Sequence, residues 1–368
     1  MKRNGEIDAL RFVFAFMILL HHFSQTLLYA ISPFGSIGVE FFFIVTGYFM
    51  ARHVEALRRR ENRQTQSIPD DTWHFILGKI RVFYKYYIVA IIWQIVVRGF
   101  IFGRSLSSVL THTLKSIPTL TLTFCGLNNN VGFYVGNTWY LSAMIIACFF
   151  LYPILLKNYE AAIKLIFPAL ALLMIGYLVG NHSTLIIWDE RAGFLRAGIL
   201  RAMGDIALGC SLCPLVDWLK KQFADLPEKG RGRVGVVLTV VKYLCYAVLV
   251  GFALNCIPGM QLDTSFSMHA LFFCVIGVVL TFSQVGWYIP DSALTRTLGK
   301  MSLVMYVFHG VLRRTLGDYG IRSASATEYW VIIVFAIALC VDLGFLTDLL
   351  ADRLGRVVHL KSRVKTGT

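Results

Sequence analysis

Long apolar runs alternate with short polar segments along the whole chain. A transmembrane α-helix needs about 20 predominantly apolar residues, and runs near that length recur from one end of the chain to the other. They comprise residues 7–30, 36–51, 82–102, 139–156, 165–180, 199–216, 234–254, 266–286, 300–317 and 329–350. This pattern predicts an all-α polytopic membrane protein with about ten transmembrane helices.

The composition favours the same class. Of the 368 residues, 57% are hydrophobic and 15% are charged, whereas a soluble domain carries about 25% charged residues. A net charge of +14 is also compatible with nucleic-acid binding, but most basic residues lie in short segments between apolar runs. There they set membrane topology, so we expect contact with membrane lipids and no nucleic acid. The eight cysteines form no clustered Cys/His set, and we expect no metal.

The basic residues also orient the predicted helices. An even number of spans places both termini on one side of the membrane. If that side is the cytoplasm, most of the 35 Lys and Arg residues fall in cytoplasmic segments, as the positive-inside rule requires. We therefore predict cytoplasmic termini, a single transmembrane domain over residues 1–352, and a short basic cytoplasmic tail over residues 353–368. The first run is too long and polar for a cleavable signal peptide, so none is predicted.

The first run contains charged and titratable residues, which are costly inside a membrane and rarely kept without a use. Arg11 and His22 are eleven residues apart, so on a helix they project from one face about 16 Å apart. Asp8 falls near that face, whereas His21 points away from it. One interpretation is a snorkelling Arg with a His satisfied by a neighbouring helix. The other is a polar stripe that lines a site for a charged, reactive substrate.

Other polar residues in or beside the runs allow similar pairs of interpretations. Glu40 is either an interfacial residue or a carboxylate that orients an imidazole. Arg201 and Asp205 have the i, i+4 spacing of mutual neutralisation, which we favour, although Arg201 can instead face an outer cavity. Trp139 falls where an interfacial Trp is expected. His309 lies in the ninth run.

Two connections are long. Residues 52–81 are basic and partly amphipathic, which fits either an anchor on anionic lipid or a surface for a polyanion. Residues 103–138, with the stretch Asn128-Asn129-Asn130-Val131-Gly132, are predicted to roof an outer cavity.

Several familiar catalytic motifs are absent from the sequence. It contains no Walker loop, no GxSxG elbow and no HExxH pair, which argues against ATP-driven transport and most hydrolases. A His-centred site reached past cationic side chains remains. Such a site suits acyl transfer from a phosphate-bearing donor, because cations bind the phosphates while His removes a proton from the acceptor hydroxyl.

Four stretches resemble the membrane-bound acyltransferase-3 family over nearly the whole chain. In the order of the family they read IDALRFVFAFMILLHHF, GVEFFFIVTGYFMA, TWYLSAMIIACFFLYP and GKMSLVMYVFH. The resemblance implies a ten-helix core that takes an acyl group from cytoplasmic acyl-CoA and passes it to a hydroxyl. It also implies roles for single residues. The matched positions are the catalytic His (His22), the CoA-engaging Arg (Arg11), the acidic residue of the second motif (Glu40), the Trp of the fourth span (Trp139) and the C-terminal His (His309).

Two stretches depart from the common pattern of this family. Many relatives carry Trp-Ser-Leu-x-x-Glu at the fourth span. This chain reads Trp139-Tyr140-Leu141-Ser142-Ala143-Met144, which is similar to the W-F-L-x-A subgroup. The Arg-x-x-Arg run before the third span is replaced by GKIRVFYK, whose basic residues are Lys79, Arg81 and Lys85. No esterase-like domain follows the last predicted span.

These observations lead to the hypothesis of an acyl-CoA-dependent O-acyltransferase, multi-pass in the cytoplasmic (inner) membrane. Acyl-CoA, in the first place acetyl-CoA, is the expected donor. The acceptor is expected to be an envelope glycan or a lipid-linked saccharide. The residues predicted to bind the donor are the basic ones near the cytoplasmic face, Arg11, Lys79, Arg81 and Lys85.

The predicted catalytic residues are His22, as general base or as acyl carrier, and Glu40, which would fix the tautomer of His22. The predicted substrate contacts are Trp139, Arg201 and His309. The alternative from another class is a carrier or flippase for a lipid-linked sugar or an anionic envelope metabolite. It would use the same buried His and Arg residues as a translocation path.

Overall fold

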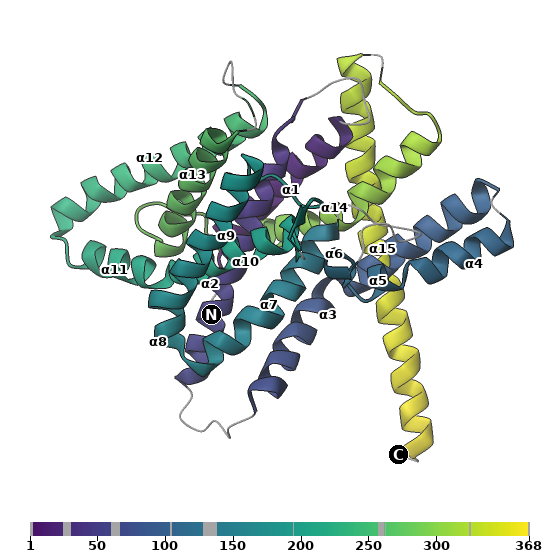
Figure 1. Cartoon of the computed structure of the whole chain (residues 1–368), viewed down its shortest axis with the longest axis horizontal. Helices are drawn as coiled ribbons and strands as arrows, with labels where there is room; N and C mark the ends of the chain where they lie inside the picture. The colour runs from purple at the N-terminus through teal and green to yellow at the C-terminus, as the bar shows by residue number, and fades with distance from the viewer. Residues whose placement is uncertain are drawn as a thin grey trace.

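The computed structural model is almost entirely helical (Figure 1). It describes residues 3–24, 31–59, 67–103, 105–127, 138–193, 195–256, 261, 263–323 and 325–366. The predicted Asn128–Gly132 stretch lies outside these ranges. Within them, strands occur only in one antiparallel hairpin, where Arg191 pairs with Arg196 and Ala192 with Leu195.

The helices and strands follow in one continuous order along the chain. They are α1 (Gly5–Ser24), η1 (Gly35–Ile37), α2 (Gly38–Arg58), α3 (Ile68–Gln94), η2 (Ile95–Ile101), α4 (Leu106–Lys115), α5 (Ile117–Leu120), α6 (Phe124–Leu127), α7 (Trp139–Lys157), α8 (Tyr159–Ala161), η4 (Ala162–Ile166), α9 (Phe167–His182), β1 (Arg191–Ala192), β2 (Leu195–Arg196), α10 (Ala197–Ser211), α11 (Cys213–Ala224), α12 (Glu228–Ala253), α13 (Thr264–Ser283), α14 (Ala293–Asp318) and α15 (Ala326–Thr366).

Nine helical stretches in the described part of the chain are long and apolar enough to cross a membrane. They are Gly5–Ser24, Gly35–Arg58, Ile68–Val97, Trp139–Lys157, Tyr159–His182, Ala197–Ala224, Glu228–Ala253, Thr264–Ser283 and Ala326–Arg353. The prediction of an all-α polytopic membrane protein is thereby confirmed. The ninth predicted run, 300–317, lies in α14, a long helix whose polar residues keep it outside this set.

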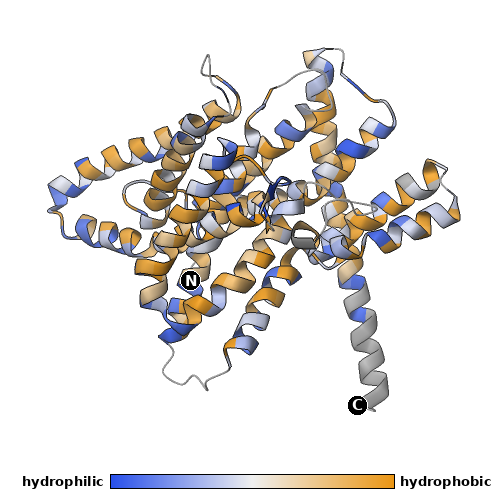
Figure 2. Ribbon diagram, in the orientation of Figure 1, coloured by the Kyte–Doolittle hydropathy of each residue, from blue (hydrophilic) through white to orange (hydrophobic). Residues whose placement is uncertain are grey.

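Hydrophobic residues run along most of the helices (Figure 2), and several of them face outward. Leu172 of α9, Val236 of α12 and Phe345 of α15 are 75%, 65% and 68% exposed. Such exposure is unfavourable in water and favourable against lipid tails. Helix α15 continues to Thr366, so residues 353–366 of the predicted basic tail are helical.

The middle of the bundle is formed by α1 and α14, which run side by side in the same direction (Figure 1). At their first halves Asp8 lies against Gly299, where a Cβ would come within 2.7 Å of the carboxylate. At their second halves His22 lies against His309. The first turn of α1 is fixed from α12, because the buried Lys242 pairs with the buried Glu6 at 2.8 Å.

Helices α2 and α10 approach each other closely through two glycines. A Cβ on Gly47 would lie 2.0 Å from the carbonyl oxygen of Ile206, and one on Gly209 would lie 2.0 Å from that of Ile44. Small residues at a helix interface allow backbones to pack at this distance in a membrane. This contact brings Glu40 on α2 beside Arg201 on α10.

Candidate functional site

A cavity of about 900 Å³ opens between the first halves of α1 and α14 and the middle of α3, with walls from α2 and α7. Its volume is at the upper end of the range for sites that bind small molecules and cofactors, about 300–1,000 Å³. Among the described residues, seven basic side chains line it: Arg3, Arg11, Lys79, Arg81, Lys85, Arg296 and Lys300. Asp8 is the one acidic residue in this described lining.

The four basic residues predicted to bind a donor, Arg11, Lys79, Arg81 and Lys85, all line this one cavity. Lys79 and Arg81 have no ion-pair partner among the residues that the structure describes, so no carboxylate competes with a ligand for them. Sequence reasoning had assigned Arg296 and Lys300 only to membrane topology. The spacing of Arg296 and Lys300 could have indicated that they line the same cavity, because residues at i and i+4 lie on one face of a helix.

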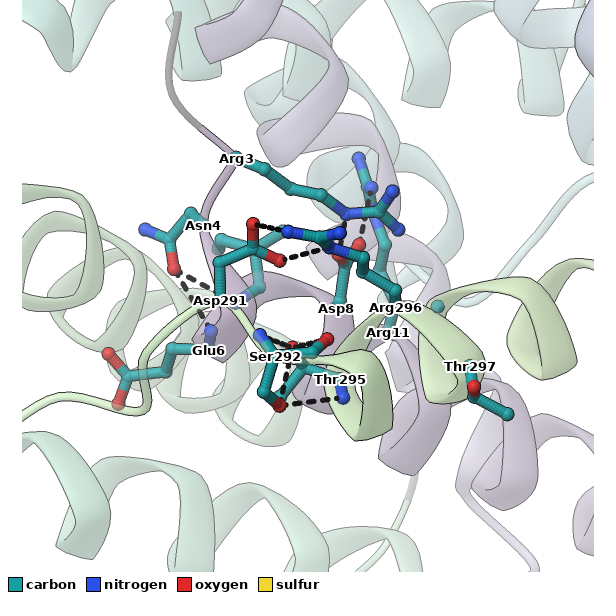
Figure 3. A network of polar contacts seen from close by, with 12 residues as sticks. Arg3, Asn4, Glu6, Asp8, Arg11, Asp291, Ser292, Thr295, Arg296 and Thr297 are labelled. Atoms are coloured by element: carbon teal, nitrogen blue, oxygen red, sulfur yellow. Dashed lines mark hydrogen bonds and ion pairs between the residues drawn. The ribbon is translucent and has the colours of Figure 1, made fainter.

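Two carboxylates position three of the four arginines that line the cavity (Figure 3). Asp8 is 5% exposed and accepts from Arg3 Nε at 2.5 Å and from Arg11 Nη1 at 3.4 Å. Asp291 accepts from Arg296 Nε at 2.9 Å and from its Nη2 at 2.7 Å. These hydrogen bonds hold the pKa of the Asp291 carboxyl below its usual value. Three guanidinium groups from two helix starts thus gather in one place.

A third carboxylate positions two of the three lysines that line the cavity. Asp348 of α15 pairs with Lys85 of α3 at 2.6 Å and also with Lys300 of α14. The same carboxylate accepts a hydrogen bond from the Tyr86 hydroxyl at 2.8 Å. One acidic residue therefore holds two ammonium groups, which come from two different helices, at the wall of the cavity.

The inner end of the cavity is aromatic and apolar. Phe42, Tyr140 and Tyr306 line it, with Met144 and Leu303. The Tyr140 and Tyr306 rings meet edge to face at 5.6 Å. These side chains carry no charge, so a molecule that fills the cavity meets ring faces as well as cations.

Two histidines lie directly behind this aromatic wall. The Tyr306 ring, which lines the cavity, is 5.9 Å from the His309 ring, and the His309 ring stacks on His22 at 5.2 Å. His309 is fully buried, and its Nδ1 is 2.9 Å from the carbonyl oxygen of Met305. Because a carbonyl oxygen only accepts, the proton is on Nδ1 and Nε2 is the acceptor nitrogen in the neutral ring.

His21 occupies a different environment from His22. Its Nδ1 is 3.1 Å from the carbonyl oxygen of Ser32, in the segment before η1. Its ring also meets the His22 ring edge to face at 5.1 Å. Of the two histidines, His22 is the one whose ring stacks on His309.

Glu40, Arg201 and Trp139 are brought together in a separate buried cluster. Arg201 Nη2 donates to Glu40 Oε1 at 2.5 Å, and the two side chains are 1% and 3% exposed. The Arg201 guanidinium lies 5.4 Å from the Trp139 ring centroid. The favoured pairing of Arg201 with Asp205 is not formed as a direct contact: the ion-pair partner is Glu40, because packing of α10 on α2 supplies a closer carboxylate, and Arg201 acts on Asp205 only through space. The Glu40 carboxylate is bonded to Arg201 and not to the His22 imidazole that it was predicted to orient.

No group of three His, Cys, Asp or Glu side chains in the described ranges is arranged to hold a metal ion. The chemistry that the described residues offer is therefore anion binding next to an imidazole pair. Cations with hydrogen-bond donors bind phosphate groups, and an imidazole accepts a proton near neutral pH.

Comparison with known proteins gives one result. A family model described as an acyltransferase domain, that of the acyltransferase-3 family, matches residues 4–345. No curated protein and no solved structure matches the chain.

Proposed function

Because the chain belongs to the acyltransferase-3 family and is an acyltransferase, we propose that it moves an acetyl or other small acyl group from cytoplasmic acyl-CoA. The proposed acceptor is a hydroxyl of an envelope glycan or of a lipid-linked saccharide precursor. The proposed location is the cytoplasmic membrane, with the basic cavity on the cytoplasmic side. Membership of this family favours the enzyme over the carrier alternative.

The observation that carries the proposal is the distribution of charged and uncharged side chains around the cavity. The seven basic side chains of its wall suit the phosphate groups of CoA, and the uncharged part formed by Phe42, Tyr140 and Tyr306 suits the thioester. Arg11 and His22 lie on one helix about 16 Å apart along its axis, a span on the scale of a pantetheine arm. A donor with its phosphates at Arg11 would therefore place its thioester near the imidazole pair.

In the proposed reaction His22 acts as the general base. It removes the proton of the acceptor hydroxyl while the hydroxyl oxygen attacks the thioester carbonyl carbon. A C–O bond forms, the C–S bond breaks, and the CoA thiolate takes the proton back from the imidazolium. In the alternative covalent route, His22 first takes the acyl group from CoA and then passes it to the acceptor hydroxyl. This two-step route gives the same products, and the proposal includes both routes.

His309 is proposed to assist His22. Its proton is fixed on Nδ1 by the Met305 carbonyl, so its Nε2 can accept but not donate while the ring is neutral. Trp139 and Arg201 are proposed to contact the acceptor, and Glu40 is assigned with them because Arg201 binds it.

The test is transfer of labelled acetyl from acetyl-CoA by purified protein in lipid vesicles, with an envelope-glycan extract as acceptor. His22→Ala is expected to lower the rate by about 10²- to 10⁴-fold. His269→Ala, an exposed histidine of α13, is the matched control and should keep the wild-type rate. Undiminished transfer by a folded His22→Ala protein would overturn the proposed role of His22.

A further inference from the structure

A second cavity, of about 500 Å³, adjoins the basic one. Four aromatic side chains line it, namely Tyr48, Phe49, Phe282 and Tyr288. Arg3 lines both cavities and so marks the boundary between them. The two cavities are therefore neighbours, one on each side of Arg3.

Most of these rings are fixed by one another. Tyr48 and Phe282 stack with centroids 3.7 Å apart, and Phe49 meets Phe282 edge to face at 5.3 Å. Tyr288 is different, because it is 43% exposed and stacks on no other ring in the described part of the chain. A flat heteroaromatic ligand could therefore use the Tyr288 face without displacing a protein contact.

The polar groups of the second cavity include a lysine that forms no direct ion pair with a described residue, although Asp217 lies near it. Lys220 lines the cavity and has no ion-pair partner within the described ranges. The side-chain amides of Asn4 and Gln284 also line it and offer both donors and acceptors. The acidic Asp291 in the lining is already paired with Arg296, so its charge is offset.

The boundary between the cavities is where the arginines gather. Figure 3 shows Arg3, Arg11 and Arg296 converging beside Asp8 and Asp291. Three guanidinium groups opposed by two carboxylates leave one positive charge in excess. A diphosphate bridging the two cavities would lie at this point and bind several of these groups at once.

We propose that the second cavity binds the adenosine 3′-phosphate end of the donor, with the base on Tyr288 and the 3′-phosphate on Lys220. The inference rests on acyl-CoA being the donor, and it assigns the diphosphate to the boundary at Arg3. Ring faces with amides and a cation match a nucleotide. A lipid head group would need the cation alone, because stacking contributes to affinity only for a flat base.

The experiment uses adenosine 3′,5′-bisphosphate as the probe, titrated into the purified full chain in detergent and followed by calorimetry. Tyr288→Ala and Lys220→Ala are each expected to weaken its binding by roughly tenfold, a typical contribution of one stacked base or one charge-assisted contact. Tyr288→Phe keeps the ring and should bind like the wild type. Lys221→Ala, the neighbouring exposed lysine, is the control for general loss of charge.

A second titration tests the 3′-phosphate alone. The wild type is expected to bind adenosine 3′,5′-bisphosphate more tightly than adenosine 5′-monophosphate, and Lys220→Ala is expected to bind the two equally. An unchanged preference in Lys220→Ala, equal binding by all variants, or no binding by the wild type would each overturn the inference.

Acetyl transfer is measured separately on the same proteins. If transfer from acetyl-CoA occurs but the probe binds without regard to Tyr288 and Lys220, the nucleotide site is wrong and the proposed function stands. If the probe binds as expected but no acetyl is transferred, the nucleotide site is supported and the proposed function fails.

Discussion

The imidazole of His22 in α1 stacks on the imidazole of His309 in α14, with ring centroids 5.2 Å apart. The two residues come from the first and the last of the four stretches that resemble the family. Their contact brings the first and the last of these stretches together directly behind the aromatic wall of the cavity. In the proposed reaction they form one catalytic unit.

We predict that His22→Ala and His309→Ala each reduce acetyl transfer strongly, and that the double variant loses little more than either single one. Residues that act as a unit have non-additive effects, because the first substitution already removes the shared function. The measurement is kcat for acetyl transfer by the three variants. Losses that multiply in the double variant would contradict joint action.

Asp348→Asn is predicted to raise the KM for acyl-CoA by about threefold to tenfold, with kcat nearly unchanged. The reason is that Asp348 positions Lys85 and Lys300 and contacts none of the proposed reacting atoms. Loss of an interaction that stabilises the bound substrate and the transition state equally raises KM and leaves kcat unchanged. Asp342→Asn, an exposed acid of the same helix, is the control. A fall in kcat without a change in KM would be the contrary result.

Arg11→Ala and Arg81→Ala are predicted to raise the KM for acyl-CoA by about tenfold or more and to leave the KM for the acceptor nearly constant. The wild-type KM for acyl-CoA should also increase with ionic strength, because salt screens exposed charges. Arg191→Ala, on the exposed hairpin, is the control. Equal increases in both KM values would count against donor binding by these residues.

The buried Glu40–Arg201 pair leads to a prediction about stability. Removing one partner of a buried ion pair costs about 3–5 kcal/mol, because the other charge stays buried. Arg201→Met should destabilise more than Glu40→Gln, because it leaves the carboxyl groups of both Glu40 and Asp205 in the interior. Thermal unfolding in detergent measures the order. Equal stability of the two variants would show that Arg201 is not needed to compensate these acids.

Gly47→Ala and Gly209→Ala are predicted to lower the unfolding temperature, because each new Cβ would meet a backbone carbonyl at 2.0 Å. Overpacking of this kind costs about 1–3 kcal/mol. Gly176→Ala in α9 has no atom within 4 Å of its Cβ and should be neutral or slightly stabilising. A drop in the control as large as in Gly47→Ala would mean that the effect is not steric.

Much of the fold follows from the sequence, because an apolar run of spanning length has few alternatives in a membrane. The shared cavity of Arg11, Lys79, Arg81 and Lys85 was also predictable. Arg11 comes early in the first run, and the other three lie at or just before the start of the third run. Odd-numbered spans begin on the same side of the membrane.

Other features depend on packing that no local pattern encodes. The pairing of Glu40 with Arg201 requires α2 and α10 to meet through Gly47 and Gly209, residues far apart in the sequence. Arg296 and Lys300 were expected to set topology, and basic residues beside an apolar run give the same signal for topology as for ligand binding. The two roles, setting topology and binding a ligand, can be distinguished only from the helices that pack around these residues.

Helix α14 contains both apolar and charged residues, and this has a consequence for how the protein is inserted into the membrane. A helix with Lys300, Arg313 and Arg314 is costly to insert into lipid alone, because each charge near the membrane centre adds about 2.5–3.5 kcal/mol. We expect α14 to enter the bilayer only against α1 and with α15, the apolar helix that follows it. The histidine pair and the basic cavity would then form at the end of translation, after most of the bundle is in place. The nascent protein would therefore be inactive until its last helix is inserted.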